Sequence, residues 1–204
     1  MEIVIADKSH AVHAKIISDT ITESASVRGT GIAKRTPEYI ITKMENGNAV
    51  IALDDDKFVG FCYIEAWGHG NFVANSGLIV HPDYRGKGVA KLIKHKIFQH
   101  SRDKFPNAKV FSITTGLAVM KMNSDLGYKP VTFSELTDDQ SFWDGCQTCK
   151  NYDVLQRTEQ KMCLCTGMLY DPLKENNKVH EHSYDKKVWT RLKNIKQSMF
   201  LKKR

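Results

Sequence analysis

Hydrophobic and polar residues follow one another along the first 133 residues in patterns typical of strands and helices in turn. The spacing predicts strands at residues 1–6, 48–53, 57–66, 73–80, 109–114 and 128–133, and helices at residues 12–24, 36–46, 87–101 and 118–126. Thr36 before Pro37 is a typical helix start, and Gly127 is a typical helix end. We expect the helix at 87–101 to carry one hydrophobic face made of Leu92, Ile93, Ile97 and Phe98. This order of elements predicts an α/β fold with a mixed central sheet flanked by helices.

The pattern changes after residue 133. Residues 134–161 form a polar, aromatic and cysteine-containing insertion, and a last strand is predicted at residues 162–170. Asp171 and Pro172 are expected to end the domain. We therefore expect a domain at 1–170 that carries the insertion, followed by a basic, helical extension at 171–204.

Composition places the chain among globular proteins, but its charge is uneven. Of 204 residues, 41% are hydrophobic and 26% are charged, which excludes a disordered, collagen-like or coiled-coil protein. The net charge is +7, yet residues 171–204 hold ten Lys and Arg against four Asp and Glu, so the preceding domain is close to neutral. We expect this tail to form a helix that packs on the domain, and binding to nucleic acid or an acidic partner is the less favoured alternative. The packing residues would be Val188, Trp189, Leu192 and Ile195.

Neither a membrane nor an oxidising compartment is indicated by the sequence. No apolar run approaches the roughly 20 residues that span a bilayer. The first residues, MEIVIADKSH, lack the basic and then apolar regions of a secretory signal. We therefore expect a cytoplasmic protein with no membrane partner and with reduced cysteines.

The most informative segment joins the strand at 73–80 to the helix at 87–101. Two glycines, Gly86 and Gly88, alternate there with the cations Arg85 and Lys87. Glycine lets the backbone approach an anion closely, and the amides at a helix start attract negative charge. The spacing is neither that of a Walker loop nor that of the dinucleotide-binding fingerprint. The residues alone leave two interpretations open, a pyrophosphate site or a tight turn without a ligand.

The same segment resembles the signature of a known enzyme family. Residues 85–90, Arg-Gly-Lys-Gly-Val-Ala, match the R/Q-x-x-G-x-G/A signature of the GCN5-related N-acetyltransferases (GNAT), after the Leu-x-Val-x-Pro of residues 78–82. The helix end at residues 125–128, Asp-Leu-Gly-Tyr, is also similar to the family. The resemblance implies the GNAT fold, with acetyl-CoA or another acyl-CoA in a V-shaped opening between the strands at 73–80 and 109–114. It assigns the pantetheine to the backbone of Leu78, Ile79 and Val80, and the pyrophosphate to the amides that follow Arg85, those of Gly86, Lys87, Gly88, Val89, Ala90 and Lys91.

Direct acyl transfer from a thioester to a primary amine, which the resemblance implies, needs a base for the amine and an acid for the leaving thiolate. Glu65, at the end of the strand at 57–66, is the expected base, and His69 in the next turn is the second choice. A solvated strand end and a simple turn residue are the respective alternatives. The family's acid is frequently a Tyr, but Asn123 stands at its position and cannot supply a proton. Tyr128 or Tyr170 could serve instead, or the thiolate could leave with hydrogen bonding alone.

Three cations in the loop before the second helix are candidates for binding the acceptor. This loop usually recognises the acceptor in the family, and guanidinium groups suit carboxylates. We therefore expect Arg28, Lys34 and Arg35 to bind an acidic amino acid, with solvated loop cations as the alternative.

The wider sequence is similar to compact N-acylglutamate synthases, which acylate glutamate at the start of arginine biosynthesis. The similar segments are residues 28–35, 67–70, 114–123 and 142–149. The resemblance implies glutamate as the small-molecule acceptor and leaves the donor open between acetyl-CoA and succinyl-CoA. Dimers are common in the family, and the sequence leaves open whether this chain forms a homodimer.

Two other functions remain open. The enzyme could acylate a protein, a polyamine or a drug amine, although a polyamine or aminoglycoside site would present carboxylates rather than cations. The chain could also be a CoA-binding module with weak catalysis, which Asn123 would favour.

Four of the five cysteines lie close together in the sequence, as Cys146-x2-Cys149-x13-Cys163-x-Cys165. A C-x-x-C pair is the usual half of a zinc site, and two cysteines two apart on a strand point to the same face. The spacing predicts a structural zinc, with reduced, partly buried thiols or a redox pair as the alternatives. Cys62 alternates within a strand and is expected in the core.

Overall fold

The computed structural model describes residues 1–28 and 35–176. The chain divides into two compact units, Met1–Tyr170 and Asp171–Arg204, and the described part of the second unit is a short helix, α7 (Pro172–Asn176). The packing predicted for the hydrophobic residues of the tail lies outside the described residues. Among the described helices, none is long and apolar enough to cross a membrane.

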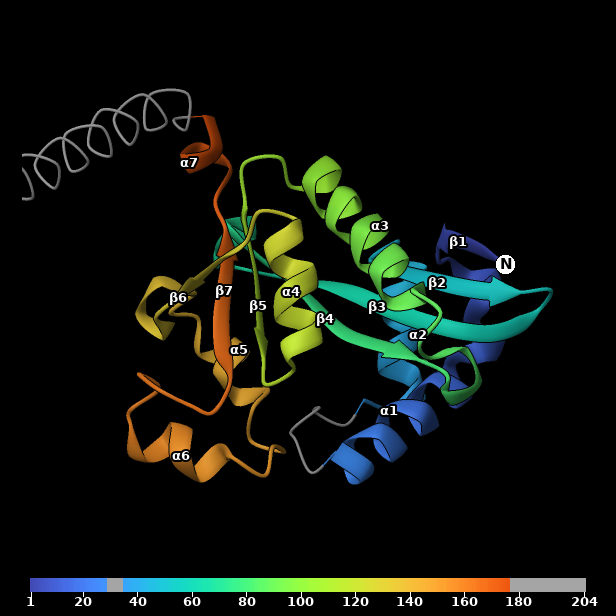
Figure 1. Ribbon diagram of the computed structural model, residues 1–204, viewed down its shortest axis with the longest axis horizontal. Coiled ribbons are helices and arrows are strands. Elements are labelled where there is room, and N and C mark those ends of the chain that lie inside the picture. Colours follow the sequence, from blue (N-terminus) through green and yellow to red (C-terminus); the bar gives the residue numbers. More distant parts are fainter. Residues whose placement is uncertain (29–34, 177–204) are drawn as a thin grey trace, which may run out of the picture. The chain divides into compact units, whose positions relative to one another are not determined.

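One sheet with helices on both faces makes up the first unit (Figure 1). Its strands are β1 (Glu2–Ile5), β2 (Ala49–Asp54), β3 (Lys57–Trp67), β4 (Phe72–Val80), β5 (Lys109–Thr114), β6 (Lys129–Val131) and β7 (Thr166–Tyr170). They lie in the order β1-β2-β3-β4-β5-β7-β6. β4 and β5 are parallel, and the other neighbours are antiparallel. The predicted α/β fold with a mixed sheet is confirmed.

Ten helices, four of them single 3-10 segments, connect these strands within the described part of the unit. The α-helices are α1 (Ala14–Arg28), α2 (Pro37–Glu45), α3 (Val89–Lys104), α4 (Leu117–Asp125), α5 (Gln140–Asp144) and α6 (Tyr152–Arg157), and the 3-10 helices are η1 (Lys8–His13), η2 (Gly68–Gly70), η3 (Pro82–Tyr84) and η4 (Phe133–Glu135). Thr36 caps α2 as predicted, because its side chain accepts a hydrogen bond from the amide of Tyr39.

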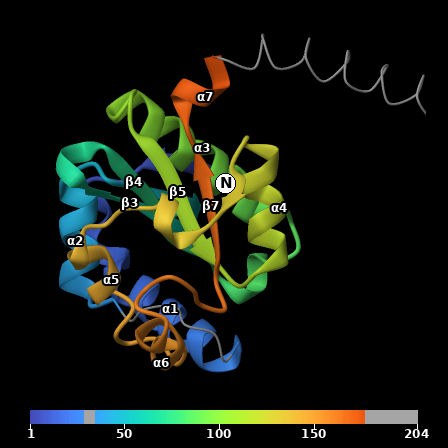
Figure 2. The same cartoon turned by 90° about the vertical axis from the view of Figure 1, so that its left-hand side faces the viewer.

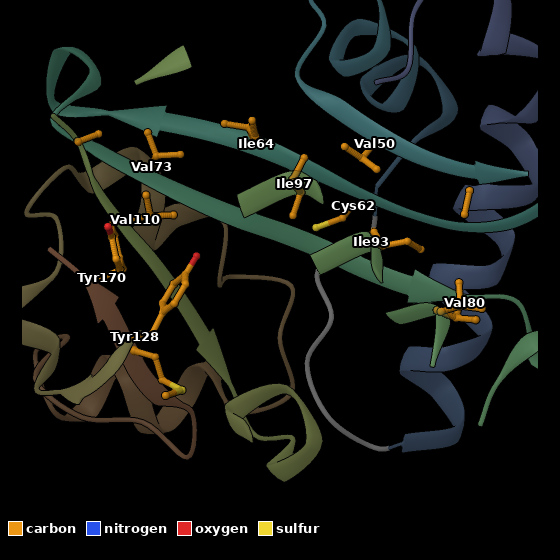
Figure 3. Close-up of a cluster of buried hydrophobic side chains, with 14 of the residues drawn as sticks. Val50, Cys62, Ile64, Val73, Val80, Ile93, Ile97, Val110, Tyr128 and Tyr170 are labelled. Atoms are coloured by element: carbon orange, nitrogen blue, oxygen red, sulfur yellow. The ribbon is translucent and has the colours of Figure 1, made fainter. Parts of the chain in front are cut away.

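One face of the sheet is covered by α3 and α4 (Figure 2). Ile93 and Ile97 of α3 pack there with Val50 of β2 and Cys62 of β3 (Figure 3). Cys62 is thus in the core, as predicted. Leu92 was expected on the same face of the helix, but it is 50% exposed, because consecutive helical residues point about 100° apart.

The opposite face of the sheet is covered in two parts. On the β1–β4 half, α1 and α2 pack on side chains such as Phe61. On the β5–β7 half, the insertion supplies its own hydrophobic cluster, in which Phe142, Trp143 and Leu155 contact Phe111. Side chains alternate along a strand, so Phe111 points away from the α3 face that its neighbour in β5 contacts. The insertion therefore continues the layer that α1 and α2 begin.

Candidate active site

β4 and β5 run parallel but remain paired only over their first three residues. Residues 72–74 pair with residues 109–111. Beyond this point the described strands that pair with β4 and β5 are β3 and β7, on their outer sides. The V-shaped opening that the family resemblance implies is therefore present, and it leaves one edge of β4 without a strand partner among the described residues.

A bulge in β4 bends this edge. Phe61 of β3 pairs with Ile79, but Tyr63 pairs with Ser76, so β4 has one extra residue between the two pairs. Gly77 in the bulge has a φ of +65°, and a Cβ atom there would overlap the ring of Tyr63. The site therefore requires glycine.

The loop from β4 to α3 has the geometry of an anion-binding site. Gly86 and Gly88 have positive φ angles of 76° and 79°, and Gly88 is the N-cap of α3. The N–H groups from Gly86 through Ala90 donate to no acceptor among the described residues. The amide of Lys91, predicted with them, donates instead to the Gly88 carbonyl at 3.0 Å. The amides before Lys91, at a helix N-terminus, are suited to bind a pyrophosphate.

Side chains hold this loop in place while its amides stay available. The Arg85 guanidinium donates through Nε to the Val80 carbonyl at 3.0 Å and through Nη2 to the Ser24 hydroxyl at 2.9 Å. Arg85 thus ties the loop to the end of β4 and to α1. The ammonium of Lys87 lies 5.1 Å from the ring centroid of Tyr84.

A cavity of about 300 Å³ lies where β4 and β5 separate. This volume lies within the range of small-molecule sites. Residues of β4 and β5 line its middle, Lys94 of α3 lines one side, and Phe142, Tyr152 and Leu155 of the insertion line another. The predicted site residues that line it are Arg35, Glu65, Leu78, Cys146, Cys149, Cys163 and Cys165.

Arg35, Tyr39, Lys43, Tyr63 and Glu65 form a polar cluster beside this cavity. Arg35 donates through Nε to the Tyr63 hydroxyl at 2.7 Å, and its guanidinium lies 5.1 Å from the ring centroid of Tyr39. The Tyr39 hydroxyl donates to the Glu65 carboxylate, and Lys43 Nζ lies 3.4 Å from the same carboxylate. The side chain of Glu65 is only 17% exposed. The cluster therefore brings two cations and one carboxylate together in a half-buried setting.

Burial and these neighbours determine the protonation of the cluster. Burial, with a further contribution from the Glu65 charge, raises the pKa of Tyr63 to about 12. Burial also raises the pKa of Tyr39, so both tyrosines are neutral near pH 7. Burial alone would lower the pKa of Arg35, but the oxygens of Tyr63, Tyr39 and Glu65 outweigh it and raise the pKa. Arg35 is therefore a fixed positive charge.

The three cations predicted to bind the acceptor are not equally placed. Arg35 lines the cavity. Arg28 is the last residue of α1, and its side chain, like all of Lys34, lies outside the described residues.

The two residues predicted on or after α4 are buried and do not line the cavity. Asn123 is fully buried; its side-chain amide donates to the Met168 sulfur at 3.7 Å, and its Oδ1 atom has no partner among the described residues. The Tyr128 hydroxyl donates to Oδ1 of Asn75 at 3.0 Å, and burial raises the Tyr128 pKa well above 10. Neither Asn123 nor Tyr128 is among the residues that line the cavity.

The two candidate bases also lie in different places. Glu65 lines the cavity, but His69 is in η2, has a φ of +56° and does not line it. Next to this turn, the carboxylate of Asp139 accepts the amide of Gly68 at 3.5 Å, and hydrogen bonds from Ser141 are the main cause that lowers the Asp139 pKa. This geometry favours Glu65.

The four clustered cysteines gather on the cavity wall, but they do not form a metal centre. Among the described residues, no three His, Cys, Asp or Glu side chains are arranged to hold a metal ion, so the arrangement does not support the predicted structural zinc. Burial, followed by the neighbouring thiols, raises the pKa of Cys146 to about 11 and that of Cys165 to about 12. All four are free thiols, and these two are protonated and unreactive near pH 7.

Several residues of the site were missed by sequence reasoning, although local signals existed. Tyr63 lies two positions before Glu65 and so shares its face of β3. Tyr39 and Lys43 are four apart on a helix whose start was predicted, so they share one face of α2. Lys94 follows Ile93 at a helix position where a charge breaks the hydrophobic pattern. Gly77 carried no such signal, because a bulge depends on pairing with another strand.

A model of one protein family matches most of this region. Residues 19–122 match the model described as the acetyltransferase (GNAT) family. The match covers just over half of the chain and runs from α1 into α4, so it includes the bulge, the glycine loop and the opening. Among curated proteins, no sequence matches this chain.

Solved structures with the same fold share little sequence with this chain. N-acetylglutamate synthase from Neisseria gonorrhoeae, complexed with coenzyme A and N-acetyl-glutamate, is 14% identical with a TM-score of 0.60 over 83% of this chain. The chain spans about a third (34%) of that enzyme's length. The protein Rv2747 from Mycobacterium tuberculosis, in complex with CoA and NLQ, is 15% identical with a TM-score of 0.59, covering 84% of this chain and 99% of its own. A phosphinothricin acetyltransferase from Sinorhizobium meliloti, in complex with AcCoA, is 15% identical with a TM-score of 0.57, covering 83% of this chain and 87% of its own.

Proposed function

The chain belongs to the GNAT family of acetyltransferases, and we propose that it transfers a short acyl group from acyl-CoA to the amine of a small acidic amino acid, with glutamate as the first candidate. The observation that carries the acceptor is the polar cluster. Its cation Arg35 lines the cavity where β4 and β5 separate, and Lys43 adds a second positive charge beside Glu65.

The donor is proposed to bind mainly through backbone groups. Its pyrophosphate would lie on the free amides from Gly86 to Ala90, and its pantetheine would follow the open edge of β4 from Val80 towards Leu78. The thioester would then reach the cavity near the bulge at Gly77. When bound, acyl-CoA supplies the activated carbonyl and the thiol leaving group.

The acceptor is proposed to bind at the polar cluster. A dicarboxylic amino acid would place a carboxylate near Arg35, whose positive charge is fixed, and its amine towards Glu65. Glu65 would take a proton from that amine, directly or through a water molecule. The Neisseria complex with N-acetyl-glutamate supports this acceptor class, and glutamate as acceptor would place the reaction at the start of arginine biosynthesis.

The experiment that tests this proposal is a screen of the purified protein. The twenty amino acids, spermidine, an aminoglycoside and a lysine peptide would each be offered with acetyl-CoA and with succinyl-CoA, and release of free thiol would be followed. We expect glutamate, with acetyl-CoA or succinyl-CoA, to give the highest kcat/KM. Activity confined to the polyamine, the aminoglycoside or the peptide would reject the acidic acceptor.

A matched pair of variants would tie that activity to the cavity. Glu65→Gln removes the proposed base, whereas Glu45→Gln makes the same change at an exposed position on α2. Thiol release that survives Glu65→Gln unchanged would exclude Glu65 as the base.

A further inference from the structure

Lys94 is a buried lysine that none of the roles described above uses. It lies on α3, is 1% exposed and lines the cavity between β4 and β5. Its ammonium is 3.4 Å from Oδ1 of Asn75 and 5.0 Å from the ring centroid of Tyr128. Within the described residues, no carboxylate forms an ion pair with it.

Packing does not explain a lysine at this position. The other buried residues of α3 are Val89, Ile93, Ile97 and Ser101. A buried ammonium without a counter-charge is expensive, and a hydrophobic side chain of similar length would fill the space at lower cost. The charge therefore points to a role in the cavity.

The polar neighbours of Lys94 form a rigid support. Asn75 donates through Nδ2 to the Ser101 hydroxyl at 2.7 Å, and its Oδ1 atom accepts from the Tyr128 hydroxyl at 3.0 Å. Ser101 donates in turn to the Ile97 carbonyl at 2.8 Å. The orientation of Asn75 is thus determined, and its Oδ1 atom holds the Lys94 ammonium by one contact. An ammonium has three N–H groups, so two remain for a ligand in the cavity.

The position of Lys94 relative to the proposed donor is informative. If the pyrophosphate lies on the amides of Gly86–Ala90 and the pantetheine runs along β4 to Leu78, the sulfur comes next, towards Gly77 and Asn75. Lys94 and these β4 residues line the same cavity. Asn123, which stands where the family often has its acid, faces Met168 instead.

We propose that Lys94 is the acid that protonates the sulfur of the departing coenzyme A. The proposal rests on the acyl-transfer function proposed above. When the tetrahedral intermediate collapses, the C–S bond breaks, the sulfur takes the electron pair, and a proton moves from the Lys94 ammonium to the sulfur. The products are the N-acyl amine, coenzyme A as a thiol and a neutral Lys94, which recovers a proton from solvent. The proton lost by the acceptor amine goes to Glu65.

The protonation behaviour of Lys94 suits this step. Burial lowers the pKa of Lys94 to about 8, so the group is mostly protonated near pH 7. An ordinary thiol has a pKa of about 8.5, so proton transfer between the two is nearly balanced. The titratable groups that face Lys94 are Cys62 from β3 and Tyr128 after α4, and burial raises the pKa of both, to about 11 for Cys62. Neither competes with Lys94 near pH 8.

The first test is the pH profile of kcat, measured with whichever amine the screen identifies. In the wild type we expect an alkaline limb that falls above about pH 8. In Lys94→Met we expect this limb to be lost and kcat at pH 7 to fall about 10²- to 10⁴-fold, the range for one acid. The Kd for acyl-CoA, measured by calorimetry, should change less than about threefold, because the phosphates bind elsewhere. Lys96→Met, the same change at an exposed position of α3, should leave all three measurements unchanged.

A second test needs no acceptor, so it separates this proposal from the proposed function. The thiol of enzyme-bound coenzyme A would be titrated by thiolate absorbance in the wild type and in Lys94→Met. A nearby ammonium should lower the pKa of the bound thiol by about 1 pH unit relative to the variant, which keeps proton transfer between the two groups nearly balanced. Identical thiol titrations, or an alkaline limb that persists in Lys94→Met, would overturn the role of Lys94. Failure of every amine in the screen would count against the acceptor alone. Thermal unfolding would confirm that the variant is folded.

Discussion

The two walls of the cavity hold their positive charges in opposite ways. On one wall, Arg35 lies beside Glu65 and Tyr63, and Lys43, which does not line the cavity, contacts the same carboxylate. On the other wall, Lys94 is buried against an amide oxygen and one ring, without a carboxylate partner among the described residues. A cation with such neighbours keeps its proton, whereas a cation buried without a counter-charge holds its proton weakly.

This difference suits the two walls to different steps of the reaction. The wall with Arg35, the paired wall, offers one fixed positive charge and so suits recognition of a charged acceptor. The unpaired wall offers a group that gives up a proton near neutral pH, which suits a chemical step. Arg35, which lies beside a carboxylate, and Lys94, which does not, could therefore not exchange roles in this cavity.

The largest expected effect comes from removing the carboxylate of the paired wall. Glu65→Gln should lower kcat by about 10²- to 10⁴-fold, because the amine loses its base, while the Kd for acyl-CoA stays the same. Steady-state kinetics and calorimetry would measure the two values. A rise in KM with no change in kcat would contradict this, since it would make Glu65 a binding residue only.

The next effect sharpens the contrast through the pH dependence of stability. The pKa of Lys94 is 10.5 when unfolded and about 8 in the fold, so between these values the unfolded chain binds the extra proton. Stability therefore rises with pH in this window. Between pH 8 and pH 10.5, the free energy of unfolding of the wild type should rise by about 3 kcal/mol relative to that of the Lys94→Met variant. Urea unfolding of both proteins at several pH values would measure it, and parallel curves would contradict it.

A third effect concerns the bulge that supports the paired wall through Tyr63. Gly77→Ala should lower the free energy of unfolding by about 2 kcal/mol or more, because a left-handed residue gains a Cβ that overlaps the Tyr63 ring. Gly47→Ala is a suitable control, since Gly47 has a φ of +59° but nothing within 4 Å of a Cβ there. Equal losses for the two variants, measured by urea unfolding, would show that the contact with Tyr63 costs nothing.

The smallest effect tests the shape of the charge on the paired wall. Arg35→Lys keeps the charge but loses the planar group that bonds Tyr63, so the KM for glutamate should rise about tenfold. That corresponds to about 1.4 kcal/mol. Arg157→Lys, on an exposed residue of α6, is the control. Wild-type kinetics in both variants would remove Arg35 from acceptor binding.

The fold could be predicted well because its strands and helices have strong local signals. The strand at residues 109–114 and the capped helix beginning at Pro37 were predicted where they are found. The insertion was less clear, since α5 and α6 are each only one or two turns long and depend on packing rather than on periodicity.

The glycine loop and the polar cluster also differ in how well they could be predicted from the sequence. The glycine loop could be recognised because its amides work through one short, contiguous segment. The polar cluster could not be predicted as a unit, because Arg35, Tyr63 and Glu65 meet only when α2 packs on β3. The arrangement of the cysteines does not support the predicted zinc for a related reason. Spacing along the chain places four thiols near each other, but it does not orient them towards one point.

The separation of β4 from β5 also has a mechanical consequence. The four strands β1–β4 and the three strands β5–β7–β6 share a seam of only three residue pairs. Such a seam lets the two halves open against each other more readily than strands paired along their full length. Hydrogen exchange should then be fastest for amides next to the seam. A molecule bound between the two edges would take the place of a missing strand and so stabilise the two halves against opening.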